Sequence, residues 1–171
     1  MRGGENEKLE QELVFPGYEK LMKTEAANML KNGISEDEKA KVLLAIEVIH
    51  NLAEYVKNEG FVALAEDEAF RQDEEYVLDI FEKEKGNIPL RDYLQSGLEI
   101  IADGRAEEVE NMMGTGYLVR GYTGADCVIA YIYLLGILKM TQGICPERIT
   151  ACLEDFIREA EKGNIHDSQL N

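Results

Sequence analysis

The feature that most constrains this chain is the uncharged apolar run CVIAYIYLLGIL, which extends from Cys127 to Leu138. A helix that spans a membrane needs about 20 consecutive apolar residues, and this run is well short of that length. We therefore interpret it as a buried helix of a soluble protein and expect no membrane insertion. The remainder of the chain must then supply the surfaces that cover this helix.

Apolar residues recur at helical spacing through most of the remaining chain. Ser35 to Glu38 reads SEDE, a capping box in which the serine hydroxyl and the glutamate carboxylate satisfy free amide groups. The stripe that follows has the spacing of a helix lying on a core and consists of Val42, Ile46, Ile49, Ala53 and Val56. No run alternates apolar and polar residues as a strand does. We predict an all-α fold, a single compact bundle of six or seven helices.

Helix boundaries follow from turn signals. Helices are expected to end at Gly33, Gly86-Asn87, Asp103-Gly104, Gly143 and Gly163. Pro89 and Pro146 suit the first turns of their helices, and the segment Thr123 to Asp126 can cap the apolar helix. Because no Ser/Pro/Gly-rich linker divides the chain, we predict one helical domain, residues 18–163. It lies between a flexible N-terminal segment, residues 1–17, and a polar C-terminal tail, residues 164–171.

The net charge of −16 excludes several classes of partner. Nucleic-acid binding and attachment to anionic membranes both need clustered lysines and arginines. A protein partner with a basic patch is compatible with such an acidic chain. The N-terminus has no apolar signal-peptide core, and the three cysteines form no C-x-x-C pair. Free thiols in a cytoplasmic protein are the simplest interpretation.

Candidate catalytic residues are few. His50 lies beside an apolar stripe and His166 lies in the polar tail, and neither has a local nucleophile or carboxylate motif, so structural or surface roles are favoured. Cys127 begins the apolar helix, where burial would raise the pKa of its thiol. Cys145 precedes Pro146 at a predicted helix start, where the helix dipole favours a thiolate. Cys145 is therefore the one thiol with a case for reactivity, although a structural role is favoured.

The stretch EDEAFRQDEE, residues 66–75, raises the question of a metal site. Hard cations prefer oxygen ligands, but the ligands must converge on one point. On one helix these carboxylates point in several directions, and a solvated acidic face is the favoured interpretation. Gly114 and Gly116 lack the preceding strand that a phosphate-binding loop requires. We predict no catalytic residue, no metal and no cofactor.

Two other glycines interrupt good helical patterns. Gly60 lies within VKNEGFVALAEDE, and Gly97 lies within PLRDYLQSGLEIIA. A glycine inside a helix costs about 1 kcal/mol relative to alanine. We therefore predict that Gly60 and Gly97 both lie at close contacts between helices, where a side chain would not fit.

Two stretches, VKNEGFVALAED (residues 56–67) and DYLQSGLEIIADGRAEEVENMM (residues 92–113), resemble in that order the cytoplasmic segment of the flagellar motor stator protein MotA. The first stretch matches that family's pattern at Gly60 and Leu64. The second matches at Tyr93-Leu94, Gly97-Leu98, Ile100-Ile101 and Asp103-Gly104.

This chain departs from the family at several positions. The family's basic residue is Lys57 here, and the acid expected after Leu64 is Ala65, with Glu66 one residue later. The connection between the two stretches is longer, and the family's four transmembrane helices have no counterpart in this chain. The resemblance thus implies no ion conduction. It implies docking on a protein partner through charged residues, of which Lys57 and Glu66 are the matching positions.

Three functions compete at this stage. The first is a soluble, non-catalytic helical module for protein interaction, related to the motor segment. The second is a small-ligand-binding protein or enzyme that uses a carboxylate-lined pocket, and the third is a self-assembling homo-oligomer. A pocket with converging histidine, cysteine or carboxylate side chains would favour the second. An extended charged or apolar face without a cavity would favour the first or the third.

Overall fold

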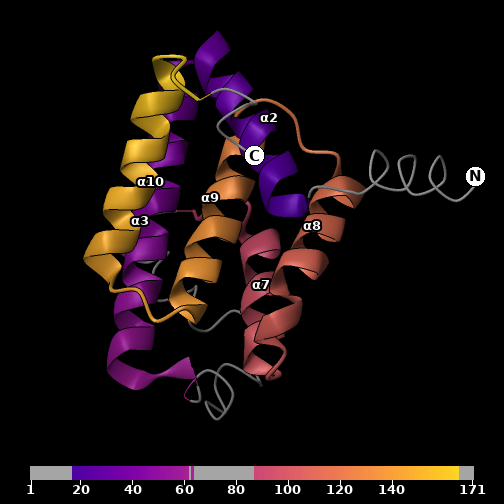
Figure 1. Cartoon of the computed structure of the whole chain (residues 1–171), viewed down its shortest axis with the longest axis vertical. Helices are drawn as coiled ribbons and strands as arrows, with labels where there is room; N and C mark the ends of the chain where they lie inside the picture. The colour runs from indigo at the N-terminus through magenta and orange to yellow at the C-terminus, as the bar shows by residue number, and fades with distance from the viewer. Residues whose placement is uncertain (1–16, 62, 64–86, 166–171) are drawn as a thin grey trace, which may run out of the picture.

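The computed structural model describes residues 17–61, 63 and 87–165. These residues form six α-helices and one short 3-10 helix, and the described part of the chain contains no strand (Figure 1). In chain order the elements are α2 (Tyr18–Asn32), α3 (Glu36–Glu59), α7 (Arg91–Ala102), η1 (Ala106–Glu108), α8 (Val109–Arg120), α9 (Ala125–Thr141) and α10 (Pro146–Glu161). The predicted all-α bundle is confirmed. Most of the two predicted terminal segments lies outside the described residues.

Helix α9 is the centre of the bundle. It packs against α2, α3, α7, α8 and α10, and Figure 1 shows it between the pair α3 and α10 on one side and α7 and α8 on the other. The apolar run from Cys127 to Leu138 lies within this helix, and most of its side chains are buried. The interpretation of this run as a buried helix is confirmed. In the described residues no helix is long and apolar enough to cross a membrane.

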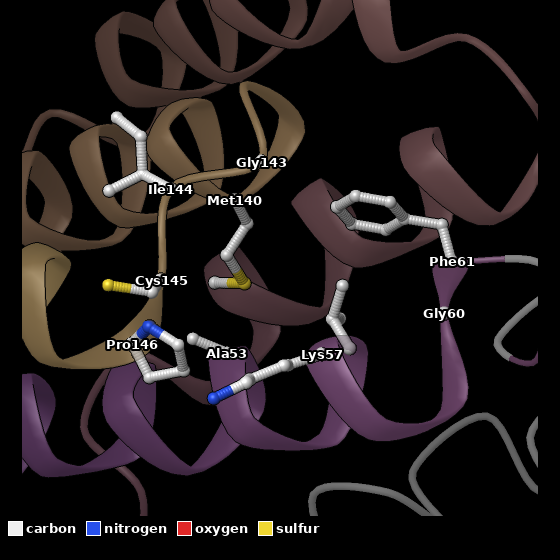
Figure 2. Close-up of a pocket in the computed structure, with 10 residues that line it drawn as sticks. Ala53, Lys57, Gly60, Phe61, Met140, Gly143, Ile144, Cys145 and Pro146 are labelled. Atoms are coloured by element: carbon white, nitrogen blue, oxygen red, sulfur yellow. The ribbon is translucent and has the colours of Figure 1, made fainter.

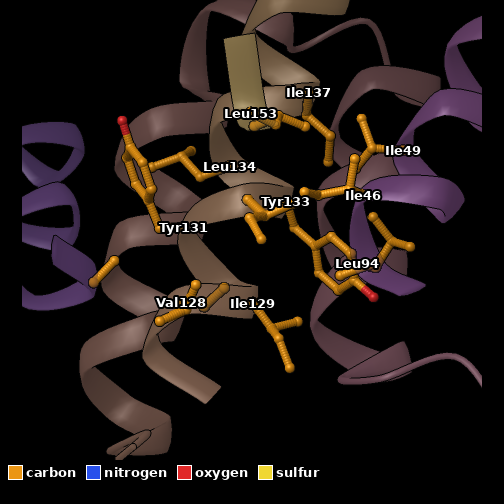
Figure 3. Packing of buried hydrophobic residues seen from close by; sticks show 14 of the residues in the cluster. Ile46, Ile49, Leu94, Val128, Ile129, Tyr131, Tyr133, Leu134, Ile137 and Leu153 are labelled. Carbon is orange, nitrogen blue, oxygen red and sulfur yellow. The ribbon is translucent and has the colours of Figure 1, made fainter. Parts of the chain in front are cut away.

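Helix α3 begins and packs as its sequence predicts. The Ser35 hydroxyl accepts a hydrogen bond from the backbone N–H of Glu38 at 3.1 Å, and a carboxylate oxygen of Glu38 accepts one from the N–H of Ser35 at 3.1 Å. The predicted stripe faces the core, where Val42, Ile46, Ile49 and Ala53 are buried and Val56 is half-buried. Figure 3 shows Ile46 and Ile49 directed toward α9, with Leu94 from α7 and Leu153 from α10 in the same cluster.

The hydroxyl groups of two buried tyrosines donate hydrogen bonds to backbone carbonyls, which avoids the cost of an unpaired polar group in the core. The hydroxyl of Tyr93 donates to the carbonyl of Met113 at 2.8 Å. The hydroxyl of Tyr133 donates to the carbonyl of Pro89 at 2.5 Å. The first bond joins α7 to α8, and the second joins α9 to the turn before α7. The relative positions of these helices are therefore set by directional hydrogen bonds as well as by burial of apolar side chains.

Gly97 lies at a close contact between helices, as predicted. A methyl group added there would lie 2.7 Å from the sulfur of Met113 on α8 and 2.8 Å from Cδ1 of Ile137 on α9. Gly136, which was not predicted in this role, does the same between α9 and α3, where an added methyl would lie 2.6 Å from Cγ2 of Ile49. Close approach of α9 to its neighbours therefore depends on a glycine of α7 at one contact and on a glycine of α9 itself at another.

The same prediction is wrong for Gly60. A methyl group added at Gly60 would meet no atom within 4 Å, and Gly60 has a φ of 81°. The helix does not continue through this residue as predicted, because α3 ends at Glu59 and Gly60 is its C-cap. Glycine is used here for a backbone conformation that L-residues rarely adopt.

Two smaller predictions about helix starts also need correction. Helix α7 begins at Arg91 and not at Pro89, because Leu90 adopts a left-handed conformation and the Pro89 carbonyl is the acceptor for Tyr133. Helix α9 has no side-chain cap from the segment Thr123 to Asp126. Its first turn is closed instead by the backbone N–H of Asp126, which donates to the carbonyl of Thr123.

Candidate functional site

A pocket of about 350 Å³ lies between the C-terminal half of α3 and the turn that joins α9 to α10 (Figure 2). Its described lining residues are Ala53, Val56, Lys57, Gly60, Phe61, Met140, Gly143, Ile144, Cys145 and Pro146. Pockets that hold small ligands in proteins are mostly apolar and range from about 300 to 1,000 Å³. This pocket is at the lower end of that range, and most of its lining is apolar.

The turn between α9 and α10 has a defined local cause. Gly143, with a φ of 75°, donates its N–H to the carbonyl of Met140, and Ile144 donates its N–H to the carbonyl of Lys139. This pair of bonds is the Schellman motif, which ends a helix at a glycine and usually places an apolar residue directly after it. Ile144 is that residue here. Pro146 then begins α10 at the position where a missing N–H has no cost.

The opposite wall comes from the end of α3. Ala53, Val56 and Lys57 lie on consecutive turns of this helix, and Gly60 ends it just before Phe61. Figure 2 shows the ring of Phe61 on the far side of the pocket from Pro146, with Met140 between them. The pocket therefore exists because two helices end beside each other and both endings carry apolar side chains.

Lys57 is the only charged residue among those described as lining the pocket. In Figure 2 its side chain extends along the α3 wall toward Pro146. Its ammonium group forms no salt bridge within the described part of the chain, and the side chain is exposed. Lys57 also belongs to the last turn of α3, where the helix dipole favours a positive charge.

Glu147 comes directly after the lining residue Pro146, on the first turn of α10. Its own backbone amide is the largest cause that holds the pKa of its carboxyl below the usual value. Burial acts in the opposite direction, and Lys57, the Cys145 thiol and His50 each add a smaller lowering effect. The carboxylate of Glu147 thus occupies the N-terminal end of α10. This is the place where an anion would otherwise bind the free amides of the helix.

His50 has a structural contact, as predicted. Its Nδ1 lies 2.8 Å from the hydroxyl of Thr150, which joins α3 to α10, and its Nε2 lies 3.7 Å from a carboxylate oxygen of Glu54. The other histidine, His166, lies outside the described residues. The structure therefore brings His50 to the same helix pair as the pocket, but in a contact that holds the two helices together.

The three cysteines are free and differ in their surroundings. Cys127 is buried, its sulfur lies 3.2 Å from the carbonyl of Tyr122, and burial raises the pKa of its thiol, as predicted. Cys152 is half-buried on α10. Cys145 is the N-cap of α10 and lines the pocket, but its side chain makes no capping hydrogen bond. Cys145 is thus the only one of the three thiols that lines the pocket.

Residues selected by the MotA resemblance fall in separate places. Lys57 and Gly60 line the pocket. Tyr93 and Gly97 pack within α7, and Asp103-Gly104 ends that helix. Leu64 and Glu66 lie outside the described residues, as does the acidic stretch at residues 66–75. Among the residues that the structure describes, no group of histidine, cysteine and carboxylate side chains could hold a metal ion.

Comparison with known proteins adds no relative. No protein-family model, curated protein or solved structure matches the chain. The resemblance to the MotA segment therefore remains a hypothesis that depends on the quoted residues alone.

Sequence reasoning identified Lys57, Gly60 and Cys145 as notable but did not join them into one site. It also missed Phe61, Met140 and Ile144. A usable signal was present in GICP, residues 143–146, where an apolar residue and a cysteine separate a helix-ending glycine from a helix-starting proline. No local signal indicated that the α9–α10 turn lies close to the end of α3.

Proposed function

We propose that this protein is a non-catalytic binding protein that takes a small apolar ligand into the pocket between α3 and the α9–α10 turn. The pocket itself is the observation that supports this function. Burial of a ligand's apolar surface against Val56, Met140 and Ile144 would provide the affinity. Lys57 and Cys145 are the polar groups that could orient the ligand.

The arrangement of the polar groups supports binding over catalysis. His50 is engaged with Thr150, and the carboxylate of Glu147 occupies the N-terminal end of α10 beside Cys145. A thiol nucleophile also needs free amides for a developing anion, and the Glu147 carboxylate already occupies the amides nearest to Cys145. The pocket is also not the carboxylate-lined site that the sequence suggested as an alternative, because none of its described lining residues is acidic.

The size of the pocket limits the ligand. A protein cavity of about 150 Å³ accepts benzene, so a pocket of about 350 Å³ has room for an apolar body of on the order of ten carbon atoms. Decanol and similar ten-carbon molecules are therefore suitable test ligands.

Binding can be tested with the neutral dye 1-naphthylamine, which is within this size and whose fluorescence shifts to shorter wavelength in apolar surroundings. We expect saturable binding to the wild-type protein and displacement by decanol. In the Val56→Trp variant the indole would fill the pocket, and dye binding should weaken at least about tenfold, which corresponds to about 1.4 kcal/mol. Leu43→Trp, on an exposed part of the same helix, is the matched control and should bind as the wild type does.

Absence of saturable dye binding by the wild-type protein would contradict the proposal. Equal binding by the wild type and Val56→Trp would also contradict it, because the dye would then occupy another surface. Thermal unfolding of both tryptophan variants would confirm that each is folded before its binding is compared.

A second proposed function is a protein-interaction module. The exposed face of α8 favours it, because Met112, Leu118 and Val119 are 39%, 51% and 80% exposed and lie around Thr115 on one side of the helix. Exposed apolar side chains gathered on one face are typical of a contact surface. The MotA resemblance would add docking through charge at Lys57 and Glu66.

These two modes of docking differ in their response to salt. Capture of a specific protein from native extract that is lost at high salt would support docking through charge. Capture that is insensitive to salt and lost in the double variant Leu118→Ser, Val119→Ser would support the α8 face. Leu43→Ser is the matched control, and capture of no protein under either condition would contradict this second function.

A further inference from the structure

We infer that the ligand of the pocket is an anionic amphiphile, with an apolar body of on the order of ten carbon atoms and a single carboxylate that Lys57 receives. This inference depends on the proposed small-ligand function. It adds the chemical class of the ligand and assigns a binding residue to it.

The charge of the pocket wall is the first argument. Lys57 is the only charged side chain among the described lining residues, and the walls around it are formed by Ala53, Val56, Met140 and Pro146. A ligand whose apolar body fills the pocket would bring its polar end to Lys57, where the described wall is charged. Because that charge is positive, an anionic end gains an attraction that a cationic end does not.

The availability of Lys57 is the second argument. Its ammonium forms no salt bridge with another described residue. The end of α3 supports the positive charge at this position through the helix dipole. The four-carbon stem of a lysine can also lie along an apolar wall while its charged end stays in water. Lys57 can therefore close over the ligand and meet its head group at the mouth.

Glu147 sets a limit on this attraction. Its carboxylate is held at the start of α10 by its own backbone amide, and it lies within the electrostatic influence of Lys57. Glu147 is not among the lining residues, so it would not contact the apolar body. A bound carboxylate would share the field of Lys57 with Glu147 and would be repelled by it. Removal of the two charges should therefore change the affinity for an anion in opposite directions.

The type of head group follows from the donors present. A single lysine offers one compact positive charge, whereas phosphate and sulfate groups are usually held by several donors or by the fork of an arginine. No arginine is among the described lining residues. One carboxylate matches one ammonium, so a singly charged carboxylate is the head group that this site fits.

The test compares three ligands of equal chain length: decanoate, decanol and decyltrimethylammonium. Each would displace 1-naphthylamine from the wild type, from Lys57→Met and from Glu147→Gln. Lys41→Met, which removes a lysine from an exposed position of the same helix, is the matched control. We expect Lys57→Met to weaken decanoate about two- to fivefold, the range of an exposed ion pair. It should leave decanol unchanged.

Glu147→Gln should strengthen decanoate binding, and Lys41→Met should not change it. The inference is overturned if decanoate loses no affinity in Lys57→Met, if Lys41→Met has an equal effect, or if decyltrimethylammonium binds more tightly than decanoate. A wild type that binds dye and decanol equally well with or without Lys57, and shows no preference for decanoate, would retain the proposed function and lose this inference. A wild type that binds no dye loses both.

Discussion

Gly97 and Gly60 occur in similar sequence surroundings, but the structure uses them in opposite ways. Gly97 lies inside α7, where a methyl group would come within 3 Å of side chains on α8 and α9. Gly60 ends α3 with a φ of 81° and has open space around the position of a side chain. Where α7, α8 and α9 meet, the chain is packed without space for one more carbon, whereas the end of α3 borders a pocket.

The difference shows what a glycine in a helical pattern can indicate. Leu98 and Ile101 continue the buried face directly after Gly97. Before Gly60, in contrast, the residues Lys57, Asn58 and Glu59 are all exposed. A glycine that follows a run of polar residues indicates the end of a helix.

The largest expected effect is that of Gly97→Val. The added side chain has no space between Met113 and Ile137, and overpacking of a closely packed core costs about 1 to 3 kcal/mol. We expect a loss at the upper end of that range, about 3 kcal/mol in the free energy of unfolding measured by urea denaturation. The double variant with Met113→Ala should recover part of the loss, because the shortened side chain leaves space for valine.

If the changes in unfolding free energy caused by Gly97→Val and Met113→Ala simply add in the double variant, this explanation is contradicted. Two variants that do not share a contact are expected to add within about 0.5 kcal/mol. A coupling above that value would show that the sulfur of Met113 is the atom that the new side chain meets.

The next largest effect is expected at Gly60, and its dependence on side-chain size distinguishes the two regions. Any L-residue is strained at a φ of 81° and a ψ of 164°, at a cost of order 1 to 3 kcal/mol. Because no atom lies within 4 Å, that cost should not grow with the side chain. Gly60→Ala and Gly60→Leu should therefore destabilise the protein by similar amounts, measured by urea denaturation. A much larger loss for leucine would restore the close contact that the sequence suggested.

Much of the fold followed from local signals of single helices, although the signals at Gly60, Pro89 and Thr123 to Asp126 were misleading. The apolar run of α9, the capping box at Ser35 and the stop at Gly143 were all local patterns, and each was found in the structure. The pocket could not be predicted in the same way. The pocket depends on Met140 and Ile144 lying opposite Val56. These residues are distant in sequence from Val56, and the packing of α3, α9 and α10 brings them together.

The start of α3 provides a smaller test of how its two ends are fixed. Gly60 ends the helix by backbone conformation, whereas Ser35 and Glu38 begin it by two hydrogen bonds. Loss of a serine N-cap costs about 1 kcal/mol, so Ser35→Ala should lower the free energy of unfolding by about that amount at neutral pH. Thermal or urea unfolding would measure it, and a loss below about 0.3 kcal/mol would contradict a role for this cap.

This effect of Ser35→Ala should also depend on pH. The backbone amide of Ser35, and then its hydroxyl, hold the pKa of Glu38 below the ordinary value of 4.5. A carboxyl whose pKa is lowered on folding stabilises the fold above its unfolded pKa, and this contribution disappears as the pH falls through the folded pKa. The difference between the wild type and Ser35→Ala should therefore shrink as the pH is lowered below 4.5. A constant difference across that range would show that the Ser35 hydroxyl does not contribute to the lowered pKa of Glu38.

The smallest effect is expected at Gly116, which completes the comparison because it lies inside a helix but outside the packed core. A methyl group there would lie 2.7 Å from Nη1 of Arg120 and 3.8 Å from the ring of Tyr93. Within the described part of the chain, the exposed guanidinium is held by the carbonyl of Gly116 at 3.2 Å and by a cation–π contact 5.3 Å from the Tyr93 ring centroid. Unlike Met113 beside Gly97, Arg120 can move into water to make space for the methyl group.

Gly116→Ala should then gain the ordinary preference of a helix for alanine, which is about 1 kcal/mol, less the loss of the contact between Arg120 and Tyr93 at about 0.5 kcal/mol. We expect a small net stabilisation, measured as a rise in the melting temperature. Arg120→Ala should remove the opposing part, so that Gly116→Ala stabilises this background by more than it stabilises the wild type. A destabilisation of 1 kcal/mol or more by Gly116→Ala would mean that close packing extends to this face of α8. Gly116 would then resemble Gly97, and a position outside the core would not be enough to make a glycine within a helix replaceable by alanine.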